Sequence, residues 1–356
     1  MKILYLVPAD FCGGAEIFAI EIAEKISQYT EIKIVTSGKS ENFIKKISPK
    51  VSLEITNFPA ISAKKFWNFF IGWRNLKKIL KKFPADIILA NSVRTALLAN
   101  FSQKKWFFFA HDNTFPKMFA KNILKNSQKI FTVSDFISHD LQQKGIFENK
   151  ICQIYNGIYP EKFTEIKQKK IKKKLKIGLI GRIDWWKGQD IFVLAAEKLQ
   201  KKIPEAQFLI FGKSNKYDPK TQEFEKKLQK IILEKKIKNV FFRGFEKIEK
   251  ILSEIDLLVH CSTKPEPFGR TILEAAAAGI PIISTDLPGG GKEILPKKFS
   301  KFLISPNNRQ KLAQKIIEIH NSFPKVSEQF FLEREKIWKK FSIEKLVQKI
   351  WQEIAK

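Results

Sequence analysis

Short runs of apolar residues alternate along the chain with longer segments in which apolar positions recur every three or four residues. The short runs predict buried β-strands, and the spacing of three and four predicts helices with one apolar face. The predicted strands form two sets, at 1–7, 32–36, 86–90, 105–110, 130–133 and 151–155, and at 175–180, 207–211, 239–243, 256–261, 281–285 and 301–304. Because strands that alternate with helices form parallel sheets, the pattern predicts an α/β fold with two doubly wound sheets.

The alternation is interrupted once, by a lysine-rich stretch between the two sets of strands. Residues 161–174 hold almost no large apolar side chain after Ile166, and a chain of 356 residues is long enough for two domains. We therefore predict a first domain over residues 1–160, a linker over 161–174 and a second domain over 175–340. The last residues, 341–356, have the apolar spacing of an amphipathic helix.

A helix predicted over residues 64–83 carries more aromatic and basic residues than one packed face needs. Its apolar stripe consists of Phe66, Phe69, Trp73, Leu76 and Leu80. Further apolar residues, Trp67, Phe70 and Ile71, widen that surface, and lysines crowd the C-terminal half. The pattern predicts a core-facing helix with a solvated lysine face. A helix of this composition also suits an anionic membrane interface, and that alternative stays open.

The composition is that of a globular protein, with 44% hydrophobic and 28% charged residues. The three cysteines, Cys12, Cys152 and Cys261, show no pairing or metal-ligand spacing, which predicts a reducing compartment without disulfides or a zinc site. We expect no secretory signal, and no apolar run approaches the roughly 20 residues that span a bilayer. These features predict a cytoplasmic protein.

The net charge of +29 is large, and the chain is rich in Ile, Phe and Lys. A genome biased toward AT-rich codons is one explanation, and an anionic partner such as nucleic acid or a lipid surface is another. The sequence shows no zinc-finger spacing, no ribonucleoprotein aromatic motif and no arginine-rich arm, so nucleic acid is not expected. We favour codon bias together with attraction to an anionic membrane surface.

A pair of glutamates stands out in residues 264–294. Glu266 lies in a Pro-flanked loop before a helix predicted over 270–278, and Glu274 lies on that helix, about two turns further along than Glu266. The amides at the helix start lack acceptors within the helix and favour an anion such as a diphosphate. They belong to Phe268, Gly269, Arg270 and Thr271. Glutamates at this spacing also occur by chance on solvated helices, but this arrangement can hold sugar hydroxyls, phosphates and ribose hydroxyls of one ligand.

Glycine turns follow two predicted strands, at the sheet edge where ligands bind in doubly wound folds. Gly13 and Gly14 follow the first strand, and Gly181 follows the strand at 175–180. Arg182 directly follows Gly181, and Lys187 directly precedes Gly188; a planar guanidinium and a compact ammonium both suit a diphosphate. Surface cations of so basic a chain usually have no specific role, but their place at a strand end favours one here.

These segments together resemble the retaining glycosyltransferases of family 4, the group 1 glycosyltransferases, which have the GT-B fold. The resemblance covers nearly the full chain, from the glycine loop at 13–14 through Gly181-Arg182 and Lys187-Gly188 to the glutamate pair. It implies two Rossmann-like domains facing a cleft. The domain at 1–160 would bind the acceptor, the domain at 175–340 would bind the donor, and the helix at 341–356 would cross back to the first domain. Gly212 is one departure, because relatives commonly have two glycines there.

The resemblance also implies roles for individual residues. Arg182, Lys187 and the helix amides would neutralise the departing diphosphate in place of a metal ion, so a nucleotide-diphosphate sugar is expected as co-substrate without a metal or other cofactor. Glu266 would hold the donor sugar and Glu274 the ribose. Donor contacts are also implied for Gly13, Gly14, Gly181 and Gly212. His111 would support the sugar during transfer, although a lone histidine is more often structural, and Asp112 and Ser134 would lie on the acceptor side. For Ser134 the role of helix N-cap ranks first and the ligand role second.

The predicted activity is transfer of a sugar to the hydroxyl of a glycan or lipid-linked acceptor. The pathway expected is synthesis of lipopolysaccharide, capsule or another cell-surface glycan or glycolipid, with the enzyme peripheral on the cytoplasmic face of the inner membrane. Within the same fold, a nucleotide-sugar epimerase or a phosphorylase stays an alternative. A basic nucleic-acid-binding protein is a further alternative, which explains the charge but not the ordered site residues.

Overall fold

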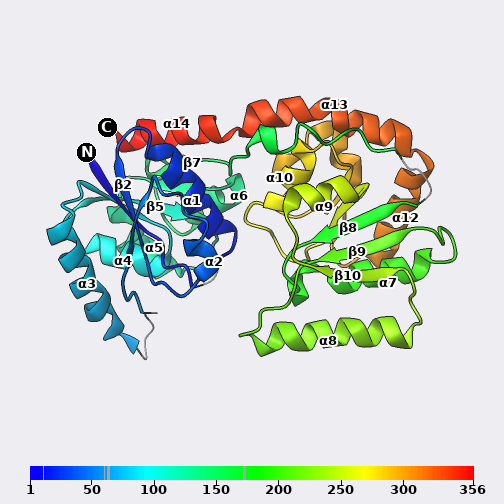
Figure 1. Ribbon diagram of the computed structural model, residues 1–356, viewed down its shortest axis with the longest axis horizontal. Coiled ribbons are helices and arrows are strands. Elements are labelled where there is room, and N and C mark those ends of the chain that lie inside the picture. The colour runs from blue at the N-terminus through cyan, green and yellow to red at the C-terminus, as the bar shows by residue number, and fades with distance from the viewer. Residues whose placement is uncertain (11, 60, 62–64, 171–173) are drawn as a thin grey trace. The chain divides into compact units, whose positions relative to one another are not determined.

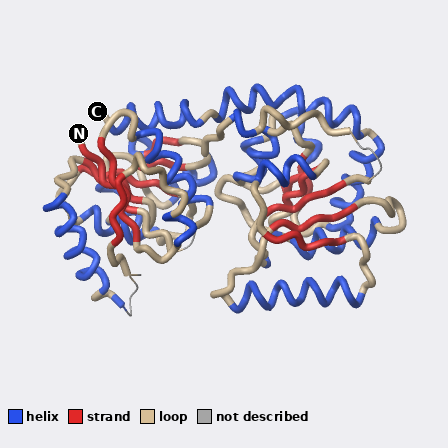
Figure 2. The backbone as a smooth tube through the Cα atoms, in the orientation of Figure 1, coloured by secondary structure: helices blue, strands red, loops and turns tan. Residues whose placement is uncertain are grey.

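The computed structural model describes residues 1–356 except 11, 60, 62–64 and 171–173. It divides into two compact units (Figure 1). Unit 1 consists of Met1–Gly157 together with Ile343–Lys356, and unit 2 consists of Ile158–Ser342. Each unit has a parallel sheet flanked by helices (Figure 2), as the alternation of apolar runs and helical segments predicted.

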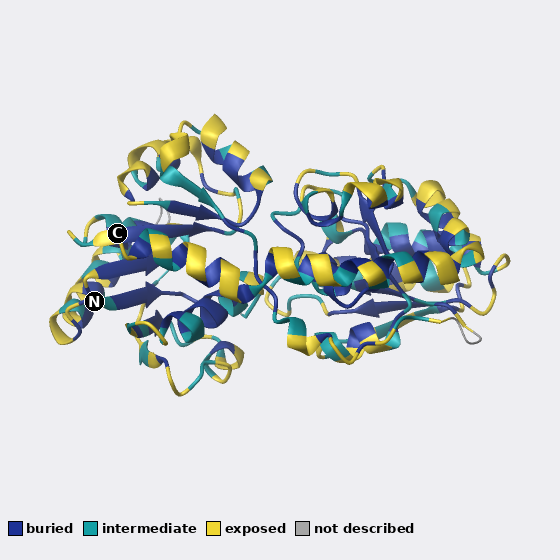
Figure 3. Ribbon diagram, turned by 90° about the horizontal axis from the view of Figure 1, so that it is seen from above, coloured by how far each residue is buried: buried dark blue, intermediate teal, exposed yellow. Residues whose placement is uncertain are grey.

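The sheet of unit 1 has seven parallel strands in the order β3-β2-β1-β4-β5-β6-β7. Their bounds are β1 Lys2–Leu6, β2 Glu31–Thr36, β3 Ser52–Ile55, β4 Ile87–Ala90, β5 Lys105–Ala110, β6 Ile130–Thr132 and β7 Ile151–Gln153. The inner strands are buried along most of their length (Figure 3), which explains why continuous apolar runs marked them. The edge strand β3 was missed, because its side chains are exposed or half-buried and show no apolar run.

The helices of unit 1 are α1 Gly14–Ile26, α2 Glu41–Ile44, α3 Asn68–Lys82, α4 Val93–Asn100, α5 Lys117–Asn122, α6 Asp135–Gln143 and α14 Ile343–Ile354. Short 3₁₀ turns lie at Leu124–Asn126 and Glu148–Lys150. The last helix, α14, packs against α1, as predicted. An ion pair of 2.9 Å joins Lys25 Nζ to Glu344 Oε1, and the Tyr29 ring stacks on Trp351. The C-terminal helix therefore completes the first unit.

Unit 2 has a six-stranded parallel sheet in the order β10-β9-β8-β11-β12-β13. Its strands are β8 Lys176–Ile180, β9 Gln207–Phe211, β10 Val240–Gly244, β11 Leu257–His260, β12 Ile282–Thr285 and β13 Leu303–Ile304. Its helices are α7 Gln189–Leu199, α8 Pro219–Glu234, α9 Ile248–Glu254, α10 Arg270–Ala277, α11 Gly291–Ile294, α12 Arg309–Asn321 and α13 Phe323–Phe341, with 3₁₀ turns at Pro160–Lys162, Trp185–Lys187 and Lys297–Phe302. In both sheets the strand order reverses beside the first strand, β1 or β8, which is where such folds bind ligands.

The segment predicted as a linker has definite contacts in its described part. Phe163 and Ile166 are buried, and the Ile166 carbonyl accepts a hydrogen bond of 2.9 Å from Arg334 in α13. The Lys169 carbonyl accepts one of 2.8 Å from Ser327. Residues 171–173 of the predicted linker lie outside the described residues. The first part of this segment is therefore packed against α13 within unit 2.

The apolar stripe predicted for residues 64–83 is wrong at its start. Helix α3 begins at Asn68 and buries Gly72, Leu76 and Ile79, whereas Phe66 is about half exposed. A Cβ at Gly72 would lie 3.2 Å from Leu98, so the helix approaches α4 closely at this glycine. The close approach turns the buried face toward Gly72 and leaves Phe66, which precedes the helix, at the surface. Lys64 of the predicted helix lies outside the described residues.

Candidate active site

The loop after β8 forms one side of the candidate site in unit 2. It ends in a 3₁₀ turn at Trp185–Lys187 and at Gly188, which has a φ of 74° and precedes α7. A Cβ at Gly188 would lie 2.0 Å from the carbonyl oxygen of Cys261, just after β11. Only glycine allows this left-handed turn to pass so close to the neighbouring strand end. The loop is thereby fixed against β11, with Lys187 next to it.

Arg182 is anchored at the start of the same loop. Its Nη2 donates to Asp184 Oδ2 at 2.8 Å, and its carbonyl accepts from Gln189 Nε2 at 2.9 Å. The guanidinium is 44% exposed and Asp184 only 9%, so the buried carboxylate orients a side chain that still faces solvent. The neighbouring turn is held by Gly212, where a Cβ would lie 2.0 Å from the Gly181 carbonyl oxygen. The predicted donor contacts of Gly181 and Gly212 stay predictions.

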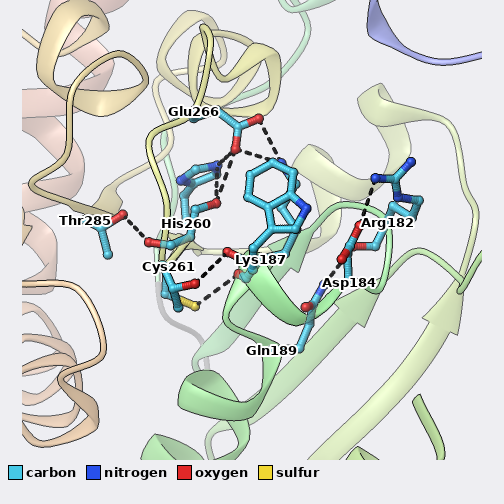
Figure 4. A network of polar contacts seen from close by, with 11 residues as sticks. Arg182, Asp184, Lys187, Gln189, His260, Cys261, Glu266 and Thr285 are labelled. Carbon is cyan, nitrogen blue, oxygen red and sulfur yellow. Dashed lines mark hydrogen bonds and ion pairs between the residues drawn. The ribbon is translucent and has the colours of Figure 1, made fainter. Parts of the chain in front are cut away.

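Lys187 and Glu266 form the central contact of the site (Figure 4). Lys187 Nζ lies 2.8 Å from Glu266 Oε1 and 2.7 Å from Oε2. Lys187 also lies over the Trp186 ring, 4.1 Å from its centroid. The two side chains are 79 positions apart in sequence and are largely buried, with 18% and 16% of their surfaces exposed. The fold therefore brings Lys187, the cation predicted to bind phosphate, into direct contact with Glu266, the carboxylate predicted to bind the sugar.

Two further side chains, which the sequence analysis missed, contact the same carboxylate. His260 Nε2 lies 3.4 Å from Glu266 Oε2, and Ser262 Oγ donates to that oxygen at 3.2 Å. Both residues are buried at the carboxyl end of β11. A signal was present, because His260 falls at the end of a predicted strand, as His111 does. Thr285 Oγ1 fixes the segment by donating to the Ser262 carbonyl at 2.9 Å.

The charge state of Glu266 follows from these neighbours. Burial by itself raises the pKa of the Glu266 carboxyl, but the Lys187 ammonium and the hydrogen bond from His260 outweigh it. Together they hold the pKa of Glu266 well below the usual carboxyl range. Glu266 is therefore an anion at neutral pH, able to accept hydrogen bonds but not to donate a proton.

This shift predicts a pH dependence of stability. A carboxyl whose pKa is lowered by folding stabilises the fold above its unfolded pKa of about 4.3, and that contribution is lost as the pH falls below this value. The free energy of unfolding of the wild type, minus that of the Glu266→Gln variant, is expected to fall by about 1 kcal/mol between about pH 6 and about pH 3. Urea unfolding across this range measures it. A difference that does not change with pH would contradict the assigned ionisation.

A glycine turn closes over the Glu266 loop. Glu266 and Gly289 form a parallel bridge, and a Cβ at Gly289 would lie 2.0 Å from the Glu266 carbonyl oxygen. Gly269, with a φ of 88°, precedes α10, and a Cβ there would lie 3.2 Å from Gly290 Cα. A small hollow opens here, lined among others by His260, Glu266 and Gly290. Glycines are needed at these points because two backbones meet and the turns are left-handed.

Helix α10 begins at this turn, as predicted. Its first residues include Arg270 and Thr271, so the amides at its start point toward the loop of Glu266. Phe268 is buried and packs edge-on against Phe341. Glu274 lies one turn in from Arg270, whose Nη2 is 3.8 Å from Glu274 Oε1. The ligand roles of these residues stay predictions.

In unit 1, His111 lies at the carboxyl end of β5 in a polar network. Its Nε2 is 2.7 Å from Asn91 Oδ1, which also accepts from the Tyr5 hydroxyl at 3.0 Å. Burial, with the charge of Glu16, raises the pKa of Tyr5, which keeps the phenol protonated as a donor. Because Asn91 Oδ1 only accepts, His111 Nε2 carries the proton in this contact. His111 is thus fixed in orientation at the sheet edge that the sequence predicted.

The other predicted residues of unit 1 have local structural roles. Gly13 precedes α1, and its amide donates to Glu16 Oε2 at 3.0 Å; Gly14 is the first residue of that helix. Asp112 accepts from the Thr114 amide at 3.0 Å. Ser134 is fully buried and caps α6, as predicted, by accepting from the Ile137 amide at 3.2 Å. Their donor-side and acceptor-side roles stay predictions.

Neither a metal-binding cluster nor a membrane-spanning helix is found among the described residues. No cluster of three or more His, Cys, Asp or Glu side chains in the described part of the chain is arranged to hold a metal ion. Nowhere among the described residues does a helix reach the length and apolarity needed to cross a bilayer. The candidate site of unit 2 combines the Glu266 carboxylate, the cations Lys187 and Arg182, and the N-terminus of α10.

Comparison with known proteins identifies two matching family models. Residues 12–162 match the model of Glycosyltransferase Family 4, and residues 161–330 match that of Glycosyl transferases group 1. An uncharacterized glycosyltransferase of Methanocaldococcus jannaschii is 23% identical over 330 residues, which cover 80% of this chain and 79% of that protein. A subunit of phosphatidylinositol N-acetylglucosaminyltransferase from Schizosaccharomyces pombe is 25% identical over 51% of this chain, which spans only 41% of that protein.

The fold is also similar to solved structures. The crystal structure of HepE from Anabaena in complex with UDP-glucose superimposes with a TM-score of 0.85. The match covers 100% of this chain and 99% of that one at 21% sequence identity. At this identity the likeness shows the fold, which is the GT-B fold expected from the sequence.

Proposed function

The chain belongs to the group 1 glycosyltransferases of glycosyltransferase family 4, and we propose that it transfers a sugar from a nucleotide-diphosphate sugar to an acceptor hydroxyl with retention of configuration. The observation that carries the proposal is the contact between Lys187 and Glu266 beside the start of α10. It brings a cation suited to phosphate and a carboxylate suited to sugar hydroxyls to one sheet edge. The presence of UDP-glucose in the similar HepE structure supports a nucleotide-sugar donor.

The cations define the proposed chemistry. During transfer, the bond from the anomeric carbon to the diphosphate breaks, a bond to the acceptor oxygen forms, and the acceptor proton passes to a diphosphate oxygen. Negative charge therefore develops on the diphosphate. Lys187, Arg182 and the amides at the start of α10 are proposed to stabilise it, because two cations and a helix N-terminus both favour an anion. We propose that this set serves in place of a metal ion, so that the reaction is metal-independent.

Donor binding requires an exchange of partners at the carboxylate. In the structure, Lys187 occupies both oxygens of Glu266. When a diphosphate attracts Lys187, His260 and Ser262 still contact Oε2, which leaves Oε1 to accept from a sugar hydroxyl. The carboxylate then keeps hydrogen-bond partners throughout, so it is not left buried and uncompensated. Glu274 is proposed to accept from the ribose hydroxyls.

His111 is proposed to act in the transfer step itself. Positive charge develops on the sugar ring as the leaving group departs, and the polar contacts of His111 fix its imidazole at the end of β5. Unit 1 is proposed to bind the acceptor. The acceptor is proposed to be a lipid-linked or cell-surface glycan, and the protein to work as a peripheral enzyme at an anionic membrane surface on its cytoplasmic side.

Release of free nucleoside diphosphate from a panel of nucleotide sugars tests the proposed function. The assay is run in EDTA, with and without a membrane lipid extract as the source of acceptor. We expect release from one donor, increased by the extract and undiminished by EDTA. A nucleotide-sugar epimerase would convert the sugar without net release. A folded protein that neither binds nor cleaves any donor of the panel would overturn the proposal.

A further inference from the structure

Helix α3 presents an outward side that the packing of unit 1 does not use. Its buried residues, Gly72, Leu76 and Ile79, face the protein, where Gly72 meets Leu98 of α4. Successive residues of a helix are rotated by about 100°, so positions 70, 74, 77, 78 and 81 lie on the opposite side. In Figure 1 the helix lies at the outer edge of unit 1, with the sheet on one side only. The composition of this outward side indicates what covers it.

A largely aromatic surface is exposed at the N-terminal end of α3 and on the two residues that precede the helix. Phe66, Trp67, Phe70 and Ile71 are 51%, 66%, 50% and 45% exposed. The centroids of the Phe66 and Trp67 rings are 4.5 Å apart, and those of the Trp67 and Phe70 rings are 5.7 Å apart. We call these four residues the aromatic patch. Isolated exposed apolar residues are ordinary, but large side chains in mutual contact at the surface mark an interaction site.

The apolar surface continues beyond the patch. Phe70 contacts Phe69, which packs edge-on against the half-exposed ring of Phe101, and an open groove follows, lined by Trp73, Leu80 and Phe101. Lys77 lies at the rim of this groove, with Nζ 3.6 Å from the centroid of the Trp73 ring. The apolar area is therefore larger than the patch alone and is bordered by a cation.

The remaining turns of the outward side are cationic. They carry Arg74, Lys77, Lys78, Lys81 and Lys82, and the helix sequence contains no Asp or Glu. The outward side thus changes along its length from aromatic to uniformly basic. A bilayer with anionic lipids has the matching pair of properties: an apolar interior next to a layer of phosphates. Aromatic side chains favour its interfacial zone, and lysines reach its headgroups.

We propose that the outward side of α3 docks on an anionic phospholipid bilayer, with the aromatic patch inserted at the headgroup level and the cations against the lipid phosphates. The surface holds unit 1, the proposed acceptor-binding unit, at the membrane where a lipid-linked acceptor is found. The proposal deepens the membrane part of the proposed function and rests on it. It does not depend on the donor site, since every residue of the surface belongs to unit 1.

Flotation with lipid vesicles tests the surface, using phosphatidylcholine alone or with about one third phosphatidylglycerol. We expect binding to the anionic vesicles about 100-fold tighter than to the neutral ones at low salt, since each basic residue near the surface adds about fivefold. Replacing Lys78, Lys81 and Lys82 by Glu is expected to remove that preference. Replacing Trp67 and Phe70 by Ser is expected to weaken binding about tenfold or more at any salt concentration.

Matched changes in unit 2 control for total charge and for exposed apolar surface. Lys220, Lys226 and Lys227 on α8 are also exposed, and their replacement by Glu changes the net charge by the same amount. Tyr217 and Phe245, which are 81% and 71% exposed, are replaced by Ser to match the aromatic variant. Both control proteins are expected to bind as the wild type does. Equal losses in both units would show non-specific charge attraction and overturn the proposal.

The position of Trp67 gives a direct readout. Lipids brominated near the headgroup quench tryptophan fluorescence at short range, and we expect this quenching in the wild type to be mostly lost in Trp67→Phe.

Besides equal losses in both units, three results would overturn the proposal: equal binding to both vesicle types, concentration-dependent dimerisation that buries the patch, or competition by a single-stranded oligonucleotide that the α3 variants abolish. Vesicle binding is measured without donor, and nucleotide release without vesicles, so failure of this surface is distinguishable from failure of the proposed activity.

Discussion

The Lys187→Met variant is expected to lose about 100- to 1,000-fold in kcat/KM for nucleoside diphosphate release. Methionine keeps an unbranched, flexible side chain of nearly the same size, but it removes the ammonium that lies over the Trp186 ring and that would stabilise the departing diphosphate. The loss is expected with any acceptor, because the leaving group is the same. Initial rates at saturating and subsaturating donor, with the donor identified from the panel, measure it.

The same change is expected to lower the free energy of unfolding by about 2 kcal/mol, because it leaves the carboxylate of Glu266 partly buried without its cation. The double variant Lys187→Met/Glu266→Gln removes both charges and is expected to regain most of that stability while staying inactive. Lys198→Met, on the exposed side of α7, controls for the substitution and is expected to change neither property. Full activity in Lys187→Met, in a stably folded protein, would exclude the proposed role of the cation.

The two glutamates are expected to separate into two kinetic classes. Glu266→Gln should lower kcat about 100-fold, because the proposed contact to the donor sugar strengthens as charge develops. The affinity of the Glu266→Gln variant for free nucleoside diphosphate should rise about fivefold. In the wild type Lys187 must break its ion pair with Glu266 before it can bind a phosphate, and the variant has no such ion pair.

Glu274→Gln should show the opposite behaviour, with affinity for free nucleoside diphosphate about tenfold weaker and a smaller effect on kcat. Calorimetric titration of the nucleoside diphosphate into both variants, followed by steady-state kinetics, gives the comparison. Each variant serves as the control for the other, because the same chemical change is made eight positions apart. If both variants lost nucleotide affinity equally, the assignment of Glu266 to the sugar would be wrong.

Much of the candidate site was predictable because it lies where strands end. In unit 2, Gly181, Lys187 and Glu266 each follow a buried strand or precede a helix, as His111 does separately in unit 1, and local apolar patterns mark such positions well. Within one sheet, parallel strands place their carboxyl ends on one edge, so the residues that follow the strands of that sheet are brought to the same edge by topology alone. The order of the motifs along the chain then sufficed to indicate the family.

Other features depended on contacts that no local pattern encodes. The edge strand β3 lacks an apolar run, and the buried face of α3 is set by the meeting of Gly72 with Leu98 rather than by the strongest apolar spacing. His260 and Ser262 contact the Glu266 carboxylate, while the Glu266 backbone forms a bridge with Gly289 of a different turn. A one-dimensional pattern cannot show which loop a turn will close over.

The sequence by itself determined the α/β class, the two sheets, nearly all of their strands, the C-terminal return helix and the family, because alternation, glycine turns and helix starts are local properties of the chain. Only the tertiary structure decided that Lys187 binds Glu266 in the absence of a ligand, that His260 and Ser262 contact the same carboxylate, and that the aromatic residues of α3 face outward. These arrangements join residues across the sheet or choose between two faces of a helix. Tertiary packing determines both the ion-pair partner and the buried helix face, since the free energy of burying one face or pairing one charge depends on neighbours far away in the sequence.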